Sequence, residues 1–384
     1  MRPILAIVAL TVAGTLVSAP AFAQQPAKAD SPPTFQPEPF WPKPLPENWV
    51  LGQVAGIAVG PDDHIWILHR PATLLDDEKG AQANPPQTKC CKAAPPVMEF
   101  DADGNLLRHW GGPGQGFDWV KNEHGLHIDK DGNVWVGGNN EGDQILQFTP
   151  DGKFVRQVGK DDGTKGPRSN DMARLNRPAH MFTDDAANEI YVADGYGNRR
   201  VIVIDATTGK FKRMWGAYGK PPVDMGPNVP YDPTKTMADY QYFQVVHCAT
   251  LANDGLVYVC DRNHNRIQIF RKDGTYVKET QISRRTLGDG VTFDVAFSKD
   301  QAQRLMYVAD GADHRIWQLL REPLTVLNHI GDGGRYPGQF YAIHNVSLDS
   351  KGNIYTTETY TGARLQKFSY KGMGPVATPE GPHN

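Results

Sequence analysis

One short pattern recurs six times along this chain and limits what the chain can fold into. Each copy is an apolar, strand-like segment that follows a turn and carries an aromatic residue at its third position. Successive aromatic residues are 69, 56, 67, 49 and 48 positions apart. A period of about 45–55 residues with occasional insertions is typical of propeller blades. The copies are HIWILHR at 64–70, NVWVGGN at 133–139, EIYVADG at 189–195, LVYVCDR at 256–262, LMYVADG at 305–311 and NIYTTET at 353–359.

Further strand-like segments surround each copy. Another alternating segment, such as HGLHIDKDGN, precedes most copies, and a third, such as NRIQIF, follows several of them. A fourth often ends in Trp-Gly, as in LLRHWGG and FKRMWGA. Six repeats of four antiparallel strands predict an all-β fold, a six-bladed β-propeller. We expect the segment from Trp41 to Val50 to supply the strand that closes the last blade.

The first residues have the pattern of an export signal. A short basic start precedes an apolar run over residues 4–17, and Ala21-Phe22-Ala23 offers a cleavage site between small residues. No later stretch approaches 18 apolar residues, so we expect no membrane span in the mature chain. We expect a periplasmic or secreted protein. The expected organisation is a signal peptide at 1–23, a Pro-rich leader at 24–44, the propeller at 45–372 and a C-terminal tail at 373–384.

The charge balance argues against one class of partner. The chain has 40 Lys and Arg against 43 Asp and Glu, a formal charge of −3. A nucleic-acid-binding protein usually shows a basic excess or a basic stripe, so we expect no nucleic-acid partner. We expect a monomer that acts on a small-molecule or peptide-derived substrate.

The chain has four cysteines, and export would permit disulfides. Cys248 and Cys260 flank a turn centred on Asp254 and are expected to face each other in a hairpin, within bridging distance. Cys90 and Cys91 are adjacent, and an ordinary bridge between them would be strained. We prefer the interpretation that all four are free or locally paired thiols without a catalytic role.

Histidines recur at one position of the repeat. Counting back eleven residues from each aromatic residue gives the residue expected to open the innermost strand of each blade, beside the central channel. At a background of about 3% histidine, four at six equivalent positions are improbable by chance. The positions found are Ala55, His124, His180, His247, Asp294 and His344, with the fifth-blade loop taken as about two residues longer.

Three of these histidines come from alternate blades. His124, His247 and His344 belong to blades two, four and six, so they would approach the channel axis with threefold spacing. Neutral imidazoles suit zinc, and three ligands leave the open fourth position of a catalytic site. His180 and Asp294 are candidate additional ligands. The alternative is a channel lined by hydrogen-bonded histidines and trapped water.

The loops that follow the second strand add polar groups to the same face. Arg70, Tyr196 and Arg262 lie just past this strand in blades one, three and four. Arginines there suit a bidentate clamp on a carboxylate, and a tyrosine near a cation suits a general base. The alternative is a set of structural salt bridges, as we expect for Asp194 with Arg200 and Asp261 with Arg266.

These segments resemble a known family. LGQVAGIAVGPDDHIWILHR, HGLHIDKDGNVWV, YVADGYGNRR, CDRNHNRIQIF and IHNVSLDSKGNIY are similar, in order, to segments of the NHL-repeat propellers, and specifically of peptidyl-α-hydroxyglycine α-amidating lyase. The resemblance covers most of residues 50–370.

The resemblance implies a zinc lyase. The family's three zinc-binding histidines fall on His124, His247 and His344. Its catalytic tyrosine falls on Tyr196, and its two active-site arginines fall on Arg70 and Arg262. The implied reaction cleaves the C–N bond of a carbinolamide, with the arginines holding the substrate carboxylate.

The chain departs from the family at three positions. The family's structural calcium would take the backbone carbonyls of Ile57 and Leu126 and a carboxylate after the third histidine. Asn345 stands there, so calcium binding is expected to be weakened, although the amide oxygen can still serve. His180 replaces a usually acidic residue, and Gly197 replaces a cysteine, which removes the family's disulfide.

Three functions remain open at this point. The first is a zinc-dependent lyase acting on an α-hydroxy-amide or a related carbinol. The second is a calcium-dependent hydrolase of the lactonase kind, which prefers oxygen ligands at the channel and is disfavoured by the histidine ring. The third is a non-catalytic propeller that binds a partner.

Overall fold

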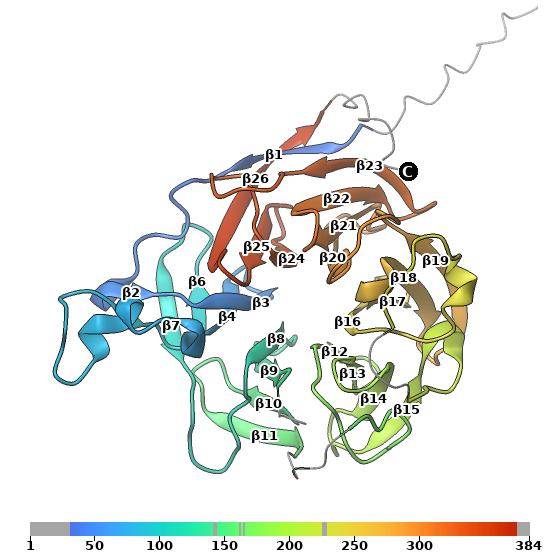
Figure 1. Cartoon of the computed structure of the whole chain (residues 1–384), viewed down its shortest axis with the longest axis horizontal. Coiled ribbons are helices and arrows are strands. Elements are labelled where there is room, and N and C mark those ends of the chain that lie inside the picture. The colour runs from blue at the N-terminus through green and yellow to red at the C-terminus, as the bar shows by residue number, and fades with distance from the viewer. Residues whose placement is uncertain (1–30, 141–143, 161–162, 164–165, 225–228, 375–384) are drawn as a thin grey trace, which may run out of the picture.

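A computed structural model describes residues 31–140, 144–160, 163, 166–224 and 229–374. Six four-stranded antiparallel sheets are arranged around a central axis like the blades of a propeller (Figure 1). The predicted fold is therefore confirmed. The expected signal peptide at 1–23 lies outside the described residues. Among the residues that the structure does describe, no helix is long and apolar enough to cross a membrane.

The first three blades follow one another along the chain, and each runs outward from the channel. Their strands are β3 (Gln53–Val59), β4 (Ile65–Arg70), β6 (Val97–Phe100) and β7 (Leu106–Trp110) in blade one; β8 (Glu123–Ile128), β9 (Val134–Gly138), β10 (Gln144–Phe148) and β11 (Phe154–Gly159) in blade two; and β12 (His180–Asp184), β13 (Glu189–Asp194), β14 (Arg200–Asp205) and β15 (Phe211–Trp215) in blade three.

The last three blades repeat this order, except that the N-terminal strand completes blade six. Their strands are β16 (Val246–Leu251), β17 (Leu256–Asp261), β18 (Arg266–Arg271) and β19 (Tyr276–Gln281) in blade four; β20 (Thr292–Phe297), β21 (Leu305–Asp310), β22 (Arg315–Leu320) and β23 (Thr325–Ile330) in blade five; and β24 (Ile343–Leu348), β25 (Ile354–Glu358), β26 (Arg364–Met373) and β1 (Pro33–Pro37) in blade six.

The closing strand is not the one we expected. β1 pairs antiparallel with β26, so residues 33–37 of the expected leader complete the ring (Figure 1). The segment from Trp41 to Val50 instead packs against blades six and one, where the Trp41 ring lies 5.1 Å from that of Tyr355 and 6.1 Å from that of Phe100. The expectation was wrong because Trp41 is buried by side-chain packing, while the short strand Trp49–Val50 pairs with Lys92–Ala93 rather than with blade six.

The recurring aromatic residue marks the second strand of each blade and lies between blades. All six are buried, with at most 2% of the side chain exposed. Each interface between neighbouring blades holds one apolar cluster, such as Tyr191 and Trp215 of blade three with Phe270 of blade four. Burial of such aromatic side chains contributes most to holding adjacent sheets together.

Two insertions explain the uneven repeat. Residues 71–96 interrupt blade one between β4 and β6, and residues 216–245 connect blades three and four. They carry short 3₁₀ helices, and β5 of the first insertion pairs in parallel with β2. The short elements outside the blades are η1 (Pro46–Asn48), β2 (Trp49–Val50), η2 (Pro71–Thr73), η3 (Asp77–Gln82), β5 (Lys92–Ala93), η4 (Ala217–Gly219), η5 (Met237–Asp239) and η6 (Arg262–His264).

The cysteines form two local pairs. Cys248 and Cys260 lie opposite each other on β16 and β17, as their hairpin positions predicted, and form a disulfide. Cys90 and Cys91 are also bonded to each other, within the first insertion. Both bonds join residues that are close in sequence, in line with local pairing.

Candidate metal centre

Three histidines from alternate blades meet at the channel axis. His124 of β8, His247 of β16 and His344 of β24 each offer one ring nitrogen, and these atoms all lie within 4.8 Å of one another. The three side chains are at most 3% exposed. Their ring centroids are 4.6 to 5.0 Å apart. The structure thus brings together the three residues that the repeat counting placed in blades two, four and six.

Irregular strand pairing aims these side chains at the axis. The pairing of the first two strands shifts around His124, His247 and His344, because one strand has an extra residue there. Such a β-bulge re-aims a side chain that would otherwise follow the regular alternation. The same shift occurs around Ala55 in blade one and Phe293 in blade five.

His180 and Asp294 do not occupy the equivalent position, which corrects our counting. His180 pairs with Ala193 in a regular hairpin, and the position that matches His247 belongs to Ala179. In blade five it belongs to Phe293, because the loop between the paired residues Phe297 and Met306 is longer than we assumed. Neither residue belongs to the nitrogen cluster, and Nδ1 of His180 instead donates to the Ala249 carbonyl at 3.2 Å.

The far nitrogen of each clustered histidine is held by a fixed acceptor. Nδ1 of His124 donates to the Ala179 carbonyl at 2.7 Å, and Nδ1 of His247 donates to the Phe293 carbonyl at 2.5 Å. Nδ1 of His344 donates to the side-chain oxygen of Asn345 at 2.7 Å. These bonds select the tautomer in which Nε2 keeps its lone pair.

Burial keeps the three rings neutral. Loss of hydration is the main cause that lowers the pKa of His124 and of His247, and the neighbouring histidines add to it. Burial, followed by the charge of Arg70, lowers the pKa of His344 to about 3. Neutral imidazole is the form that binds a metal ion.

The donor set fits zinc. The Nε2 atom of His247 is buried and has no hydrogen-bond partner among the described residues. An unsatisfied buried nitrogen is costly unless something binds it. Three neutral imidazoles match the three protein ligands of one class of catalytic zinc site, and this ligand count leaves a fourth position for water or substrate.

The calcium expectation stays a prediction. The side chain of Asn345 already accepts from His344 and donates from Nδ2 to Oδ2 of Asp294 at 3.1 Å. Calcium would compete with His344 for the amide oxygen of Asn345. β3, which carries Ile57, and β8, which carries Leu126, are neighbouring inner strands.

Tyr196 lies between the histidines and an arginine. Nε2 of His124 accepts from the Tyr196 hydroxyl at 3.0 Å, and Nη1 of Arg262 donates to the same oxygen at 3.0 Å. The guanidinium carbon of Arg262 also lies 4.8 Å from the centre of the Phe293 ring. Arg70 is anchored by Nε, which donates to the Glu123 carbonyl at 2.7 Å.

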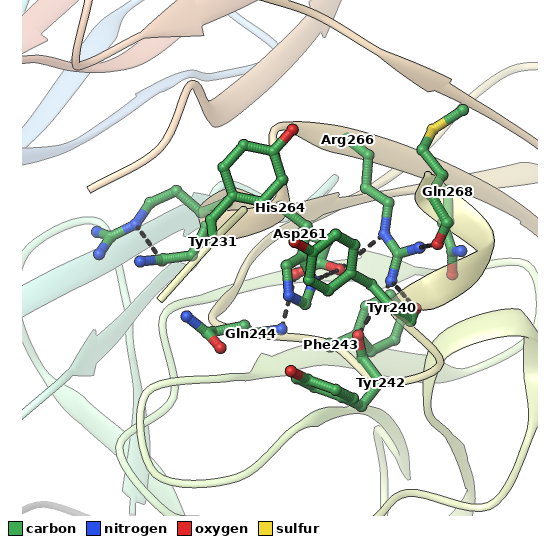
Figure 2. Close-up of polar contacts among 12 residues, drawn as sticks. Tyr231, Tyr240, Tyr242, Phe243, Gln244, Asp261, His264, Arg266 and Gln268 are labelled. Carbon is green, nitrogen blue, oxygen red and sulfur yellow. Dashed lines mark hydrogen bonds and ion pairs between the residues drawn. The ribbon is translucent and has the colours of Figure 1, made fainter. Parts of the chain in front are cut away.

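A buried polar hub is built around the residue that precedes Arg262 in the chain (Figure 2). Asp261, the preceding residue, accepts from Nδ1 of His264 at 2.8 Å and from Nε of Arg266 at 2.8 Å. Arg266 also donates to the carbonyls of Tyr240 and Tyr242 in the insertion before blade four. Asp194 and Arg200 form the matching buried pair in blade three, so both expected structural salt bridges are confirmed.

A small cavity opens above the histidines. It has a volume of about 220 Å³ and includes His344, Arg70, Tyr196 and Arg262 in its wall. All three polar residues picked from the loops after the second strand therefore share one cavity with a clustered histidine.

Other wall residues were missed by the sequence reasoning. Asn139 and Thr359 follow the second strands of blades two and six, so extending the same counting to every blade would have found them. Phe293, Asp289 and Tyr360 carried no repeat signal that pointed to them. Tyr360 donates to Asp289 at 3.0 Å at the cavity rim.

Comparisons with known proteins agree with this architecture. A family model described as NHL repeat matches residues 243–270, which span the first strands of blade four. The chain is 26% identical to peptidyl-glycine alpha-amidating monooxygenase A of Xenopus laevis over 336 residues, covering 84% of this chain and 32% of that protein. It therefore spans about a third of the length of this relative.

Two further relatives are shorter. A Caenorhabditis elegans protein named as a probable peptidyl-alpha-hydroxyglycine alpha-amidating lyase is 26% identical over 234 residues, covering 57% of this chain and 56% of that protein. NHL repeat-containing protein 3 of Mus musculus is 26% identical over 243 residues, covering 61% and 58%.

Among solved structures, a streptogramin B lyase aligns with a TM-score of 0.51 at 14% identity, covering 88% of this chain and 98% of that chain. This likeness concerns the fold alone. The chain is a six-bladed propeller of the NHL-repeat type that is distantly similar to the peptidylglycine-amidating enzymes and resembles peptidyl-α-hydroxyglycine α-amidating lyase.

Proposed function

We propose that this protein is a zinc-dependent carbon–nitrogen lyase that cleaves a carbinolamide bearing a carboxylate. One observation carries the proposal: three buried, neutral histidines converge beside a cavity whose wall also holds Tyr196, Arg70 and Arg262. The similarity to amidating enzymes, one of them named a probable lyase, supports the same class of reaction.

The arginines bind and orient the substrate. A guanidinium matches the two oxygens of a carboxylate, and two of them in one small cavity favour an anionic ligand. Arg70 is held by the Glu123 carbonyl and by Oε1 of Gln53 at 2.9 Å, so its remaining N–H groups have a fixed direction. Fixed donors place the carbinol carbon near the histidines.

Tyr196 moves the proton. Its phenol oxygen would take the proton of the carbinol hydroxyl, and the nearby Arg262 would stabilise the phenolate that performs this step. The electron pair left on oxygen then forms the second bond of a carbonyl, the C–N bond breaks, and the C–N electron pair goes to the amide nitrogen. Tyr196 gives that nitrogen the proton it took from the hydroxyl, so the products are an amide and an α-keto acid or aldehyde.

His124, His247 and His344 would hold the metal. A bound zinc ion would supply a Lewis acid that acidifies a hydroxyl close to it. The Nδ1 contacts of the three rings keep their Nε2 atoms directed to the centre.

The cavity limits what part of the substrate is enclosed. A volume of about 220 Å³ is below the range of about 300–1,000 Å³ that is usual for drug-sized ligands. We infer that the carbinol, its carboxylate and the amide enter the cavity and that any longer acyl chain lies outside.

A non-catalytic binding propeller is the second candidate. NHL repeat-containing protein 3 has the same 26% identity to this chain as peptidyl-glycine alpha-amidating monooxygenase A, over a shorter alignment, and its name specifies a repeat without a reaction. A calcium-dependent hydrolase fits less well, because the clustered ligands are nitrogens and calcium prefers oxygens.

The test begins with metal content. Protein purified without added metal is measured by elemental analysis and then assayed for glyoxylate release from an N-acyl-α-hydroxyglycine. The His124→Ala/His247→Ala double variant is compared with His109→Ala, which changes an exposed histidine on β7. We expect about one zinc per chain and activity in the wild type and in His109→Ala, and neither in the double variant.

The contrary outcomes separate the candidates. Bound zinc without cleavage of the substrate would contradict the proposed lyase activity and would still support the metal centre. No transition metal, with the double variant indistinguishable from the wild type, would contradict both and favour a binding propeller.

A further inference from the structure

His344 is held differently from the other two clustered histidines. His124 and His247 each donate Nδ1–H to a main-chain carbonyl of the following blade. His344 also has a main-chain partner in the following blade, the Ala55 carbonyl, but it is the one that additionally donates to a side-chain amide oxygen, Oδ1 of Asn345, at 2.7 Å. A main-chain carbonyl can only accept, whereas an amide can present either its oxygen or its NH₂ group. The orientation of Asn345 therefore either supports or opposes the Nδ1–H tautomer of His344.

Asp294 fixes that orientation. Its Oδ2 atom accepts from Nδ2 of Asn345 at 3.1 Å and from the backbone N–H of Val346 at 3.2 Å, and its Oδ1 atom accepts from the N–H of Val295 at 2.9 Å. Three N–H donors thus converge on one carboxyl group that is only 5% exposed. Because Asp294 engages the NH₂ end of Asn345, the oxygen end must face His344.

We propose that Asp294 and Asn345 are positioning residues that lock His344 in the Nδ1–H tautomer and so direct its Nε2 lone pair to the metal. The proposal rests on the zinc centre proposed above. Asp294 lies on β20 of blade five and Asn345 on β24 of blade six, so the pair also ties a metal ligand to the neighbouring blade. Asp294 therefore belongs to the centre through Asn345 and not as a ligand.

Removal of the Asn345 side chain tests the hydrogen bond between Asn345 and His344. Asn345→Ala takes away the side-chain partner of Nδ1, and we expect zinc to bind 10- to 100-fold more weakly, the usual loss when a ligand's supporting hydrogen bond is removed. The dissociation constant is measured by competition with a chromophoric chelator. Thr356→Val is the matched control: its hydroxyl is buried on the adjacent strand β25 and has no hydrogen-bond partner in the described part of the chain. We expect it to bind zinc as the wild type does.

Exchange of the carboxylate and the amide between positions 294 and 345 tests the hydrogen bond between Asp294 and Asn345. Asn345→Asp alone places two carboxylates side by side, and we expect weaker zinc binding because one of them must turn away from His344. Asn345→Asp combined with Asp294→Asn again pairs one carboxylate with one amide. We expect this double variant to return to within about threefold of wild-type affinity, since a carboxylate also accepts from Nδ1. If Asp294 and Asn345 only stabilised the fold, these substitutions would change the melting temperature and would not produce this pattern of zinc affinities.

The tautomer of His344 can also be measured in the zinc-free protein, so that the test does not depend on enzymatic activity. Nitrogen-15 NMR of the zinc-free protein should show His344 protonated at Nδ1 in the wild type and in the exchanged double variant, and a larger fraction of the Nε2–H tautomer in Asn345→Ala, where the Ala55 carbonyl is the remaining acceptor. If Asn345→Ala does not fold, the exchanged pair and this tautomer measurement decide the question.

Failure of this proposal differs from failure of the proposed function. Equal zinc affinity in the wild type, Asn345→Ala and Asn345→Asp would overturn the positioning role, whether or not the enzyme cleaves a carbinolamide. The expected affinities in a protein that cleaves nothing would overturn only the lyase. A wild type that binds no zinc would overturn both.

Discussion

The phenol oxygen of Tyr196 accepts a hydrogen bond from Nη1 of Arg262 at 3.0 Å. The same oxygen lies 3.0 Å from Nε2 of His124, so the phenol bridges the proposed metal ligands and a cationic side chain. Tyr196→Phe removes only this oxygen. We expect kcat to fall by about 10²–10⁴-fold, the usual contribution of a general base, while zinc content is unchanged. Steady-state glyoxylate release and elemental analysis on the same preparation measure the two effects.

A Tyr196→Phe enzyme with wild-type kcat would rule out Tyr196 as the base. Arg262→Lys is a useful companion, because it retains the charge but loses the planar guanidinium. It should raise KM and lower kcat together, since Arg262 is proposed to hold both the substrate and the phenolate.

Asp289 at the cavity rim should oppose the binding of anions. Its Oδ1 atom lies 3.9 Å from Nη2 of Arg262, and its side chain is about half exposed. A carboxylate there partly offsets the positive potential that attracts the substrate. Asp289→Asn should therefore lower KM for a carboxylate substrate about two- to fivefold, a modest change because solvent screens a rim charge. The difference should shrink in high salt, and a KM that rises instead would contradict this role.

Gly195 should tolerate no side chain. A Cβ atom at Gly195 would collide with the backbone of Val246, the residue before His247. Neither partner is the flexible end of a side chain, so the strands must move apart. Gly195→Ala should cost about 1–3 kcal/mol of unfolding free energy and weaken zinc binding, because Tyr196 and His247 flank the collision. Urea unfolding and zinc titration measure both effects.

Gly209→Ala provides the comparison for this substitution. Gly209 lies in a turn at φ 69°, where a Cβ would have only an ordinary contact with Val158. Its substitution strains the backbone without touching the site. Stability should fall while zinc affinity remains, and an equal loss of zinc affinity in both variants would argue against a local effect of Gly195.

Most of the fold could be predicted from the repeat, because an aromatic residue has the same structural role in every blade. An aromatic residue buried between sheets marked the second strand six times, from Trp66 to Tyr355. The closing strand could not be found this way, since the strand at 33–37 contains two prolines and lacks the pattern. An edge strand that pairs on one side only does not need that pattern.

Counting along the sequence placed the site residues correctly in those blades whose first hairpin has a loop of the same length. His124, His247 and His344 were found because their three hairpins have equal loops, whereas longer loops in blades three and five shifted the counting onto His180 and Asp294. The role of Asn345 depends on Asp294 of the neighbouring blade, and no spacing rule within one repeat joins residues that meet only where two blades touch. Asp289 was hidden for the same reason.

Asp261 should be costly to alter because it compensates a buried cation. Arg266 is fully buried, and Asp261 is the carboxylate bonded to its Nε atom. Asp261→Asn leaves Arg266 with less charge compensation, so we expect a loss of about 3 kcal/mol or more in unfolding free energy. It should also raise KM, since Asp261 precedes Arg262 in the chain. An unchanged unfolding midpoint would show that Glu279, which lies 3.4 Å from Arg266, suffices.

His69 should give the protein a pH-dependent stability. Its Nδ1 atom accepts from the backbone N–H of Gly52 at 3.2 Å, and its Nε2 atom lies 3.0 Å from the Pro95 carbonyl, so the ring is held neutral. Burial lowers the pKa of His69 from 6.5 to about 4. Between these values the unfolded chain binds more protons than the folded one, so stability falls as pH drops from about 6.5 towards 4. The whole effect amounts to about 3 kcal/mol.

His69→Gln isolates this contribution. A glutamine amide can accept from Gly52 and donate to Pro95 in the same way, but it does not titrate. Urea unfolding at pH 7, 6, 5 and 4 should therefore show a smaller loss of stability in the variant than in the wild type, while the two proteins differ least in their pH dependence above 6.5. Parallel curves from pH 7 to pH 4 would mean that other buried histidines account for the acid sensitivity and that His69 titrates alike in the folded and unfolded chain.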